Sequence, residues 1–206
     1  MKYVIILMAI FLTACQSLTY IQSGDILFRG RSNGSLSSAI DDVTQTGHDF
    51  HFTHMGVVEM IDGKVMVWHA APEKGVVCES LKQFSSANKE DSLMIGHFRI
   101  NGINQQKIDE ALKMAKKFKG QPYDYTYIME SEGFYCSEFV YTLFEKDSIF
   151  TLDPMTFKDA QSGEYHQGWI DHYEKMGIEI PEGKPGCNPN GMAASERLTF
   201  LGYLSN

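Results

Sequence analysis

The chain is poor in basic residues and has no N-terminal apolar run long enough to cross a membrane as a mature helix. Its 18 lysines and arginines stand against 26 aspartates and glutamates, which leaves a net charge of −8. A nucleic-acid partner needs a basic surface, so this balance argues against nucleic-acid binding. The apolar run over residues 3–12 is shorter than the roughly 20 residues that span a bilayer.

Cysteine is also scarce, with four residues in the chain, and no two of them have the CxxC spacing of a structural zinc site. His48, His51 and His54 lie close together in the sequence, but no carboxylate accompanies them at ligand spacing. The sequence therefore predicts neither a metal site nor a cofactor.

The first residues have the features of a signal peptide, because Lys2 precedes the apolar run and small residues follow it. The string Leu12-Thr13-Ala14-Cys15 resembles the bacterial lipobox, at which the leader is cleaved and the cysteine sulfur receives a diacylglycerol. We therefore expect residues 1–14 to be a lipoprotein signal peptide. Residues 15–206 have a length and apolar content that suit one globular domain.

This leader predicts a lipid-anchored protein of the bacterial cell envelope. Gln16 is not the aspartate associated with inner-membrane retention, so the periplasmic face of the outer membrane is favoured. The lipid, rather than charge, would hold so acidic a chain to an anionic membrane. A plain secretory signal with an incidental cysteine is the alternative, and the sequence indicates no oligomeric state.

If Cys15 carries a lipid, an odd number of cysteines remains: Cys78, Cys136 and Cys187. In an oxidising compartment at least one of them then lies outside any intramolecular disulfide. Cys78 and Cys187 can pair and leave Cys136 free, but their spacing does not establish this bridge.

The apolar pattern predicts a mixed α and β chain. Residues 54–60 and 64–70 flank a turn over residues 61–63 and predict an antiparallel hairpin. Residues 30–47 are rich in Gly, Ser and Asp and predict a loop, with a helical turn over residues 35–41. Further strands are expected over residues 25–29, 76–79, 94–100 and 197–203.

Two helices are expected in the second half of the chain. Over residues 105–119 the apolar positions fall on one helical face, and Gly120 follows as a C-cap. A second apolar face runs over residues 136–146. Residues 153–194 contain several prolines and many turn residues, so this stretch is expected to be mostly loop.

Cys136 is thereby placed at the start of a helix, and His54 and His69 on adjacent strands. A thiol in the first turn of a helix faces unpaired N–H groups and the positive end of the helix dipole, which favour the thiolate. A nearby imidazole can take the proton, and a second polar side chain can orient that imidazole. We therefore expect a thiol nucleophile with a pKa below the free value of about 8.5.

Five strings in this chain resemble the NlpC/P60 group of papain-like hydrolases, but in a permuted order. The usual order has the tyrosine and nucleophile strings first, whereas here they come last. The arrangement resembles the permuted branch, the YaeF/YiiX-type papain-like amidases, and is distantly similar to lecithin:retinol acyltransferase. The strings are GDILF (24–28), HMGVV (54–58), VWHAA (67–71), PYDYTY (122–127) and YCSEFV (135–140).

The resemblance implies an α+β papain-like fold, in which an antiparallel sheet packs against the helix that bears the nucleophile. It implies Cys136 as the nucleophile, His54 as the base and His69 as the third, orienting group. Tyr123 matches the tyrosine whose hydroxyl helps the Cys136 backbone N–H stabilise an oxyanion. Asp25 matches the GD string and is expected to be structural or to support the site from behind. The permuted branch often has a carboxylate where His69 stands, so His69 follows the non-permuted pattern.

Each assignment has a structural alternative. Cys136 can be a core cysteine, because cysteine is among the most buried residue types. His54 can cap a strand edge, His69 can be a hydrogen-bonded core histidine beside Trp68, and Tyr123 can pack under its loop.

These features predict a cell-envelope thiol hydrolase, a cysteine peptidase or amidase, that forms an acyl-enzyme thioester. The resemblance and the expected address favour peptidoglycan peptides as substrates. A thiol-dependent acyltransferase or a lipid hydrolase with acyl substrates is the first alternative, and a non-catalytic envelope binding module is the second. A long apolar tunnel would favour acyl chains, and an open polar groove would favour peptides.

Overall fold

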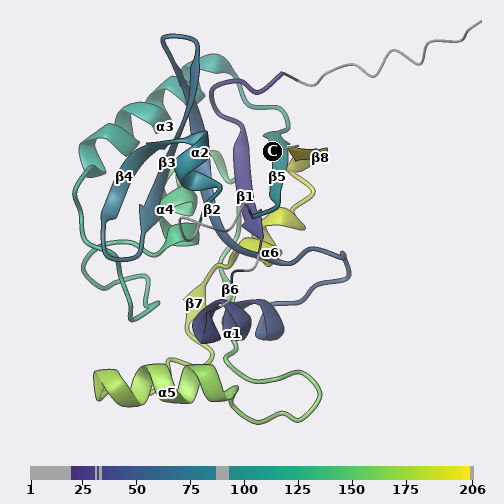
Figure 1. Cartoon of the computed structure of the whole chain (residues 1–206), viewed down its shortest axis with the longest axis vertical. Coiled ribbons are helices and arrows are strands. Elements are labelled where there is room, and N and C mark those ends of the chain that lie inside the picture. Colours follow the sequence, from purple (N-terminus) through teal and green to yellow (C-terminus); the bar gives the residue numbers. More distant parts are fainter. Residues whose placement is uncertain (1–19, 31, 33, 87–92, 205–206) are drawn as a thin grey trace, which may run out of the picture.

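The computed structural model describes residues 20–30, 32, 34–86 and 93–204 of the chain (Figure 1). The expected signal peptide and Cys15 lie outside the described residues. Within those ranges, no helix is both long enough and apolar enough to cross a bilayer.

The centre of the molecule is an antiparallel sheet of six strands in the order β4-β3-β2-β1-β5-β8. Two short strands, β6 (Asp153–Pro154) and β7 (Pro185–Gly186), form a separate ladder. The strands of the main sheet are β1 (Ile26–Gly30), β2 (Phe52–Ile61), β3 (Lys64–Ala71), β4 (Gly75–Ser80), β5 (Ile95–Ile100) and β8 (Leu198–Leu204).

Helices accompany this sheet, which confirms the expected mixture of α and β structure (Figure 1). Figure 1 shows α3 and α4 beside the β4-β3-β2 half of the sheet, and α1 and α5 together at one end of the molecule. The helices are α1 (Ser35–Val43), α2 (Leu81–Phe84), α3 (Gln105–Phe118), α4 (Cys136–Phe144), the 3₁₀ turn η1 (Glu145–Asp147), α5 (Gln167–Met176) and α6 (Pro189–Ala193).

The two faces of the sheet belong to two separate hydrophobic cores. Successive side chains of a strand point to opposite faces, so β2 and β3 contribute to both cores. Met55, Val57 and Trp68 belong to the main core with α3 and α4. Val58 and Val67 belong to a smaller core, beneath Phe84 of α2. Side chains that alternate along β2 and β3 therefore face either α4 or α2.

The hairpin of β2 and β3 is confirmed, but its turn has two residues and not three. Ile61 pairs with Lys64, and Asp62 and Gly63 between them both have positive φ, 50° and 72°. Two central residues with positive φ are typical of a type I′ turn, whose twist matches that of the flanking strands.

The ladder between β2 and β3 is shorter than the strands themselves. It runs from the turn to the pair Val57↔Trp68 and ends there. Beyond this pair β2 remains paired with β1, as far as Gly30↔Phe52, and β3 remains paired with β4, as far as Ala71↔Gly75. The paired register of β2 and β3 therefore stops before His54 and His69, the two histidines of the sequence motifs.

The expectation that residues 153–194 are mostly loop was wrong for α5. This helix begins after His166, whose ring accepts a hydrogen bond from the Gly168 N–H, and ends at Gly177 with a φ of 68°. Trp169 and Tyr173, four residues apart, are buried on its inner face. The amphipathic pattern of this helix is only ten residues long, and the glycines and prolines around it indicate a loop, so the helix was not predicted.

Candidate active site

Cys136 is the first residue of α4, and its side chain is buried. The N-cap residue Tyr135 is extended, with a φ of −83°, and its N–H donates to the Glu138 carboxylate at 3.1 Å. The sulfur of Cys136 meets the backbone N–H groups of Ser137, Met55 and Cys136 itself. Two of these N–H groups belong to the first turn of a helix, where no intrahelical carbonyl is available to them.

The contact with Met55 shows where the thiol lies relative to the sheet. Met55 is beyond the last β2–β3 pair, and its N–H meets the Cys136 sulfur. Met55 also follows His54 in the chain. The thiol therefore lies beside β2, at the backbone of the residue that follows the expected base.

Burial raises the pKa of the Cys136 thiol to about 11, and the surrounding N–H groups and the positive charge of Arg29 offset this only in part. The expectation of a pKa below the free value was therefore wrong. The helix N-terminus is present as predicted, but the loss of water around the buried sulfur destabilises the thiolate more than the helix N-terminus stabilises it. At neutral pH the resting group is a neutral thiol.

His54 and His69 lie close together, as the motif order predicts, and both are buried. His54 Nε2 and His69 Nδ1 are 2.8 Å apart and share a hydrogen bond. Both rings pack on Phe84, with centroid distances of 5.7 and 5.1 Å, so they lie on the α2 face of the sheet.

Both imidazoles are neutral at neutral pH. Burial lowers the pKa of His54 well below its usual value, and the nearby charge of Arg29 lowers it further. Burial also lowers the pKa of His69, although a hydrogen bond to Glu79 opposes this effect. A neutral imidazole can accept a proton, whereas an imidazolium cannot.

Glu79 is a polar neighbour of the histidines that sequence reasoning missed. Its Oε2 is 3.2 Å from His69 Nε2, and its Oε1 accepts a hydrogen bond from Lys74 Nζ at 2.7 Å. The hydrogen bond from His69 lowers the pKa of Glu79 to about 2. Residues 76–79 were expected to be a strand, but only the β3–β4 register places this carboxylate beside His69.

Arg29 was missed as well. It pairs with His54 across the β1–β2 ladder, and its guanidinium lies over the Phe84 ring at 5.6 Å from the centroid. Its NH1 donates to the Phe84 carbonyl at 3.0 Å, while its buried Nε has no hydrogen-bond partner among the described residues. Arg29 thus places a positive charge close enough to Cys136 to lower the pKa of the thiol.

Tyr123 lies near the thiol, and Tyr127 lies nearer to the pocket. Burial raises the pKa of Tyr123, and the neighbouring Tyr127 and Cys136 raise it further, which shows that these groups are close in space. Tyr127 has a φ of 54°, rare for a non-glycine residue, and its ring meets Trp169 edge-on at 5.1 Å. Backbone strain of this kind is often found at functional sites. The oxyanion role of Tyr123 stays a prediction.

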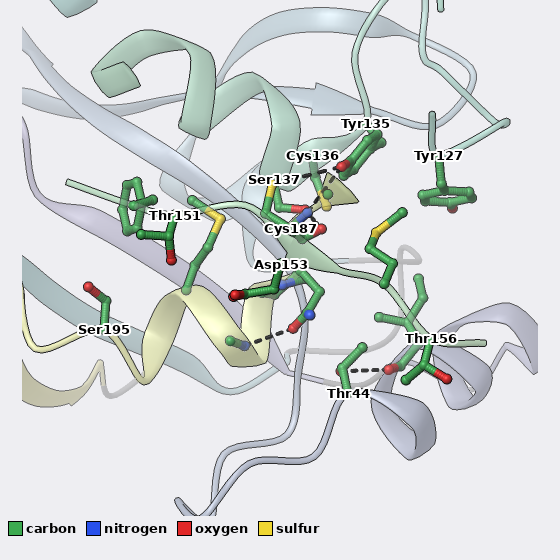
Figure 2. A pocket seen from close by; sticks show the side chains of 18 of the residues that line it. Thr44, Tyr127, Tyr135, Cys136, Ser137, Thr151, Asp153, Thr156, Cys187 and Ser195 are labelled. Carbon is green, nitrogen blue, oxygen red and sulfur yellow. Dashed lines mark hydrogen bonds between the residues drawn. The ribbon is translucent and has the colours of Figure 1, made fainter. Parts of the chain in front are cut away.

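A pocket of about 450 Å³ adjoins Cys136 (Figure 2). Figure 2 shows Tyr127 and Thr156 on one side of it and Thr151 and Ser195 on the other. Ser137, beside the thiol, donates to the Cys187 carbonyl at 2.9 Å and so fixes one wall. The apolar side chains that line the pocket include Ile40, Val43, Ile149, Phe150, Met155, Phe157, Trp169 and Met192.

Asp25 is held elsewhere, at the β1–β5 pair. It accepts hydrogen bonds from Arg99 Nε at 2.8 Å, from His97 Nε2 at 2.7 Å and from the Gln22 N–H at 2.9 Å. Burial alone would raise the pKa of Asp25, but the bonds from Arg99 and His97 outweigh burial and lower it. These contacts match the structural role that was one of the two expectations for this residue.

The remaining cysteines do not pair. Cys78, on β4, and Cys187, on the pocket wall, are both free thiols, so the possible bridge between them is absent. Burial raises the pKa of Cys187 to about 12 and that of Cys78 to about 11.

The chain is similar to known proteins in sequence and in fold. The family model of the permuted papain-like amidase enzymes, YaeF/YiiX, C92 family, matches residues 20–202. The uncharacterized protein YiiX of Escherichia coli K12 is 27% identical over 124 residues, which make up 60% of this chain but only 57% of that protein. The crystal structure of the metalloprotein YiiX from Escherichia coli O157:H7 has a TM-score of 0.70 at 24% identity, over 88% of this chain and 96% of that one. The α+β papain-like fold is thereby confirmed.

That crystallised protein is described as a metalloprotein. In the ranges that the structure of this chain describes, no three His, Cys, Asp or Glu side chains come together in an arrangement that would hold a metal ion.

Proposed function

Because the chain belongs to the permuted papain-like amidase family and is a cysteine hydrolase of that family, we propose that Cys136 is its nucleophile, His54 its base and His69 the group that orients His54. The observation that supports this assignment is a buried thiol at the helix start whose sulfur meets the N–H of Met55, the residue that follows His54 in the chain. His54 in turn shares a hydrogen bond with His69, and both imidazoles are neutral. Neutral partners suit a mechanism in which the proton moves during attack rather than before it.

The proposed reaction has two halves. As the Cys136 sulfur attacks the carbonyl carbon of an amide, His54 takes the thiol proton, and the oxyanion forms beside the Cys136 N–H and the Tyr123 hydroxyl. The C–N bond then breaks, His54 returns its proton to the leaving amine, and a thioester remains on Cys136. In the second half His54 takes a proton from water as the water oxygen attacks the thioester carbon. The C–S bond then breaks, His54 returns the proton to the Cys136 sulfur, and the acid is released.

Peptidoglycan stem peptides are the leading substrate class. Two points support this choice: the family consists of amidases, and the predicted periplasmic address lies beside that polymer. Acyl amides or esters are the second candidate, because the pocket beside Cys136 is lined largely by apolar side chains (Figure 2).

Intact mass of the enzyme during turnover separates the two substrate classes. Wild-type protein is mixed with muropeptides in one reaction and with N-acyl amino acids and phospholipids in another. The mass added to Cys136 should equal a peptidyl group in the first case or a fatty acyl group in the second. Hydrolysis without any adduct, and unchanged in Cys136→Ala, would contradict the thioester mechanism.

The thiol assignment predicts an unusual pH profile for alkylation by iodoacetamide. Cys78 is a matched comparison, because burial raises its pKa to about 11 as well, and its charged neighbours are glutamates and lysines. The rate at Cys78 should rise about tenfold per pH unit below its pKa, as the thiolate fraction does. The alkylation rate at Cys136 should be higher than that at Cys78 near pH 7. It should also rise less steeply with pH, since His54 can take the proton of the Cys136 thiol.

The His54→Ala variant provides the control. Without the base, labelling of Cys136 should slow at pH 7 and follow the steep pH profile of Cys78. Peptide mass spectrometry resolves both sites in one sample. Identical pH profiles at Cys136 in wild type and His54→Ala would remove His54 from the mechanism.

We also propose that the mature protein is held in the cell envelope by a diacylglyceryl group on Cys15, at the periplasmic face of the outer membrane. The lipobox-like string that ends at Cys15 supports this proposal. Cys15→Ala should prevent lipidation and maturation, so that the uncleaved precursor accumulates. Intact mass and membrane fractionation test this, and a soluble, unlipidated mature wild type would exclude the anchor.

A further inference from the structure

The two catalytic candidates His54 and His69 form one end of a longer chain of polar contacts. The chain continues from His69 to Glu79 on β4, at 3.2 Å, and from Glu79 to Lys74 in the turn before β4, at 2.7 Å. Its inner end is the 2.8 Å contact between His54 and His69. Each hydrogen bond along this path needs one donor and one acceptor. Once the protonation of one end is known, the direction of every bond in the chain follows.

The carboxylate sets the direction of these hydrogen bonds. Glu79 is ionised at neutral pH, with a pKa of about 2, and an ionised carboxylate only accepts hydrogen bonds. His69 Nε2 must therefore carry the proton, and in a neutral ring Nδ1 is then the acceptor. His54 Nε2 must donate to that acceptor, so the lone pair of neutral His54 is on Nδ1.

We propose that Glu79 is a positioning residue: it holds His69, and through it His54, in the tautomers that leave the Nδ1 lone pair of His54 free to take the proton of Cys136. This inference rests on the proposed roles of Cys136 and His54. A His54 ring with its proton on Nδ1 could not act as a base through that atom, so the choice of tautomer decides whether the site works.

The surroundings of Glu79 suit this role. Its side chain is only 13% exposed, and it is faced by His69 from β3 and by Lys74 from the turn, while the charge of Arg29 acts on it from β1. Lys74 is 60% exposed but binds the oxygen that His69 does not use. Each oxygen of the carboxylate therefore has its own partner, and the contact with His69 does not depend on Lys74.

Lys74 makes the Glu79→Gln variant informative. An ammonium group only donates hydrogen bonds, so the glutamine amide should turn its oxygen to Lys74 and its NH₂ to His69. His69 Nε2 must then accept, its Nδ1 must donate, and His54 must carry its proton on Nδ1. The whole chain of hydrogen bonds reverses, although the shape of the side chain is kept.

Iodoacetamide labelling of Cys136 in the full chain at pH 7 tests the proposal. Glu79→Gln should lower the rate about tenfold, which is less than the factor of about 10²–10⁴ that a general base contributes in complete reactions. Lys74→Met should leave the rate within about twofold of wild type, since Glu79 keeps its contact with His69. In the double variant the amide oxygen is free to turn toward His69, and most of the lost rate should return. No recovery in a folded double variant would contradict the proposal.

Nitrogen-15 NMR of histidine-labelled protein supplies a readout that a merely structural role would not move. Wild type should show the proton of His54 on Nε2, and Glu79→Gln should show it on Nδ1. A wild-type His54 with its proton on Nδ1 would overturn the proposal even if Glu79→Gln does not fold. An unchanged tautomer together with an unchanged labelling rate in Glu79→Gln would overturn it as well.

The two proposals can fail separately. If Cys136→Ala retains full hydrolysis while the tautomers switch as expected, the nucleophile assignment fails and the positioning by Glu79 stands. If Cys136 is required while Glu79→Gln changes neither tautomer nor rate, only the positioning role fails.

Discussion

Replacing Cys136 with alanine is expected to lower hydrolysis by at least about 10³-fold, because removal of a nucleophile leaves only substrate binding and oxyanion stabilisation to act on the substrate. The fold itself should stay intact, since the substitution removes only one sulfur atom. Turnover of the substrate found by the adduct experiment, measured at saturating concentration, gives the size of the effect.

Two further variants make this result specific. Cys78→Ala removes a partly buried thiol of equal pKa outside the pocket and should leave turnover within about twofold of wild type. Turnover by His69→Ala should lie between the values for Cys78→Ala and Cys136→Ala, because the nucleophile and the base remain but the base is no longer oriented. Turnover in Cys136→Ala above one tenth of the wild-type value would exclude Cys136 as the nucleophile.

Replacing Asp25 with alanine is expected to destabilise the fold by about 3 kcal/mol, the lower end of the range for breaking a buried ion pair. The lower end applies because the Arg99 side chain is 31% exposed and can recover some hydration, whereas His97 is buried. Urea unfolding monitored by fluorescence gives the free energy. Hydrolysis by the folded fraction should be retained, because the partners of Asp25 lie at the β1–β5 pair.

The dependence on pH has a defined sign. The folded-state pKa of Asp25 is lowered, so its stabilising contribution is present above the unfolded value of about 3.9 and is lost as the pH falls through the folded-state pKa. The difference between wild type and Asp25→Ala should therefore shrink in acid. Asp109→Ala, on the exposed face of α3, is the control and should cost less than about 0.5 kcal/mol. A loss from Asp25→Ala no larger than that of this control would contradict the structural role.

Local sequence patterns were enough to predict several elements. The hairpin was predicted from two apolar runs around Asp62-Gly63, and α3 from a period of 3.6 whose members Ile108, Ala111 and Leu112 are indeed buried. These signals are local, because a turn type and a helical face are properties of neighbouring residues. The start of α4 at Cys136 was predicted for the same reason.

Features that depend on contacts between residues far apart in the sequence were not predicted. The helix α5 is held by aromatic contacts such as Phe157 with Trp169, at 4.9 Å, and Phe157 lies outside the helix. Arg29 and Glu79 are far apart in the chain and join the histidines only through the pairing of β1 with β2 and of β3 with β4. Strand register depends on the whole sheet, so no local pattern indicates which carboxylate meets which imidazole.

The sequence by itself determined the family, the permuted order of the motifs, the helix that begins at Cys136 and the adjacent strands that carry His54 and His69. Only the tertiary structure decided that the β2–β3 ladder ends before these histidines, that Glu79 closes their hydrogen-bond chain, and that burial keeps the thiol neutral. The physical reason is that the cost of removing a charge from water depends on everything packed around it. A helix terminus can be recognised from a few neighbouring residues, but the desolvation that outweighs it cannot.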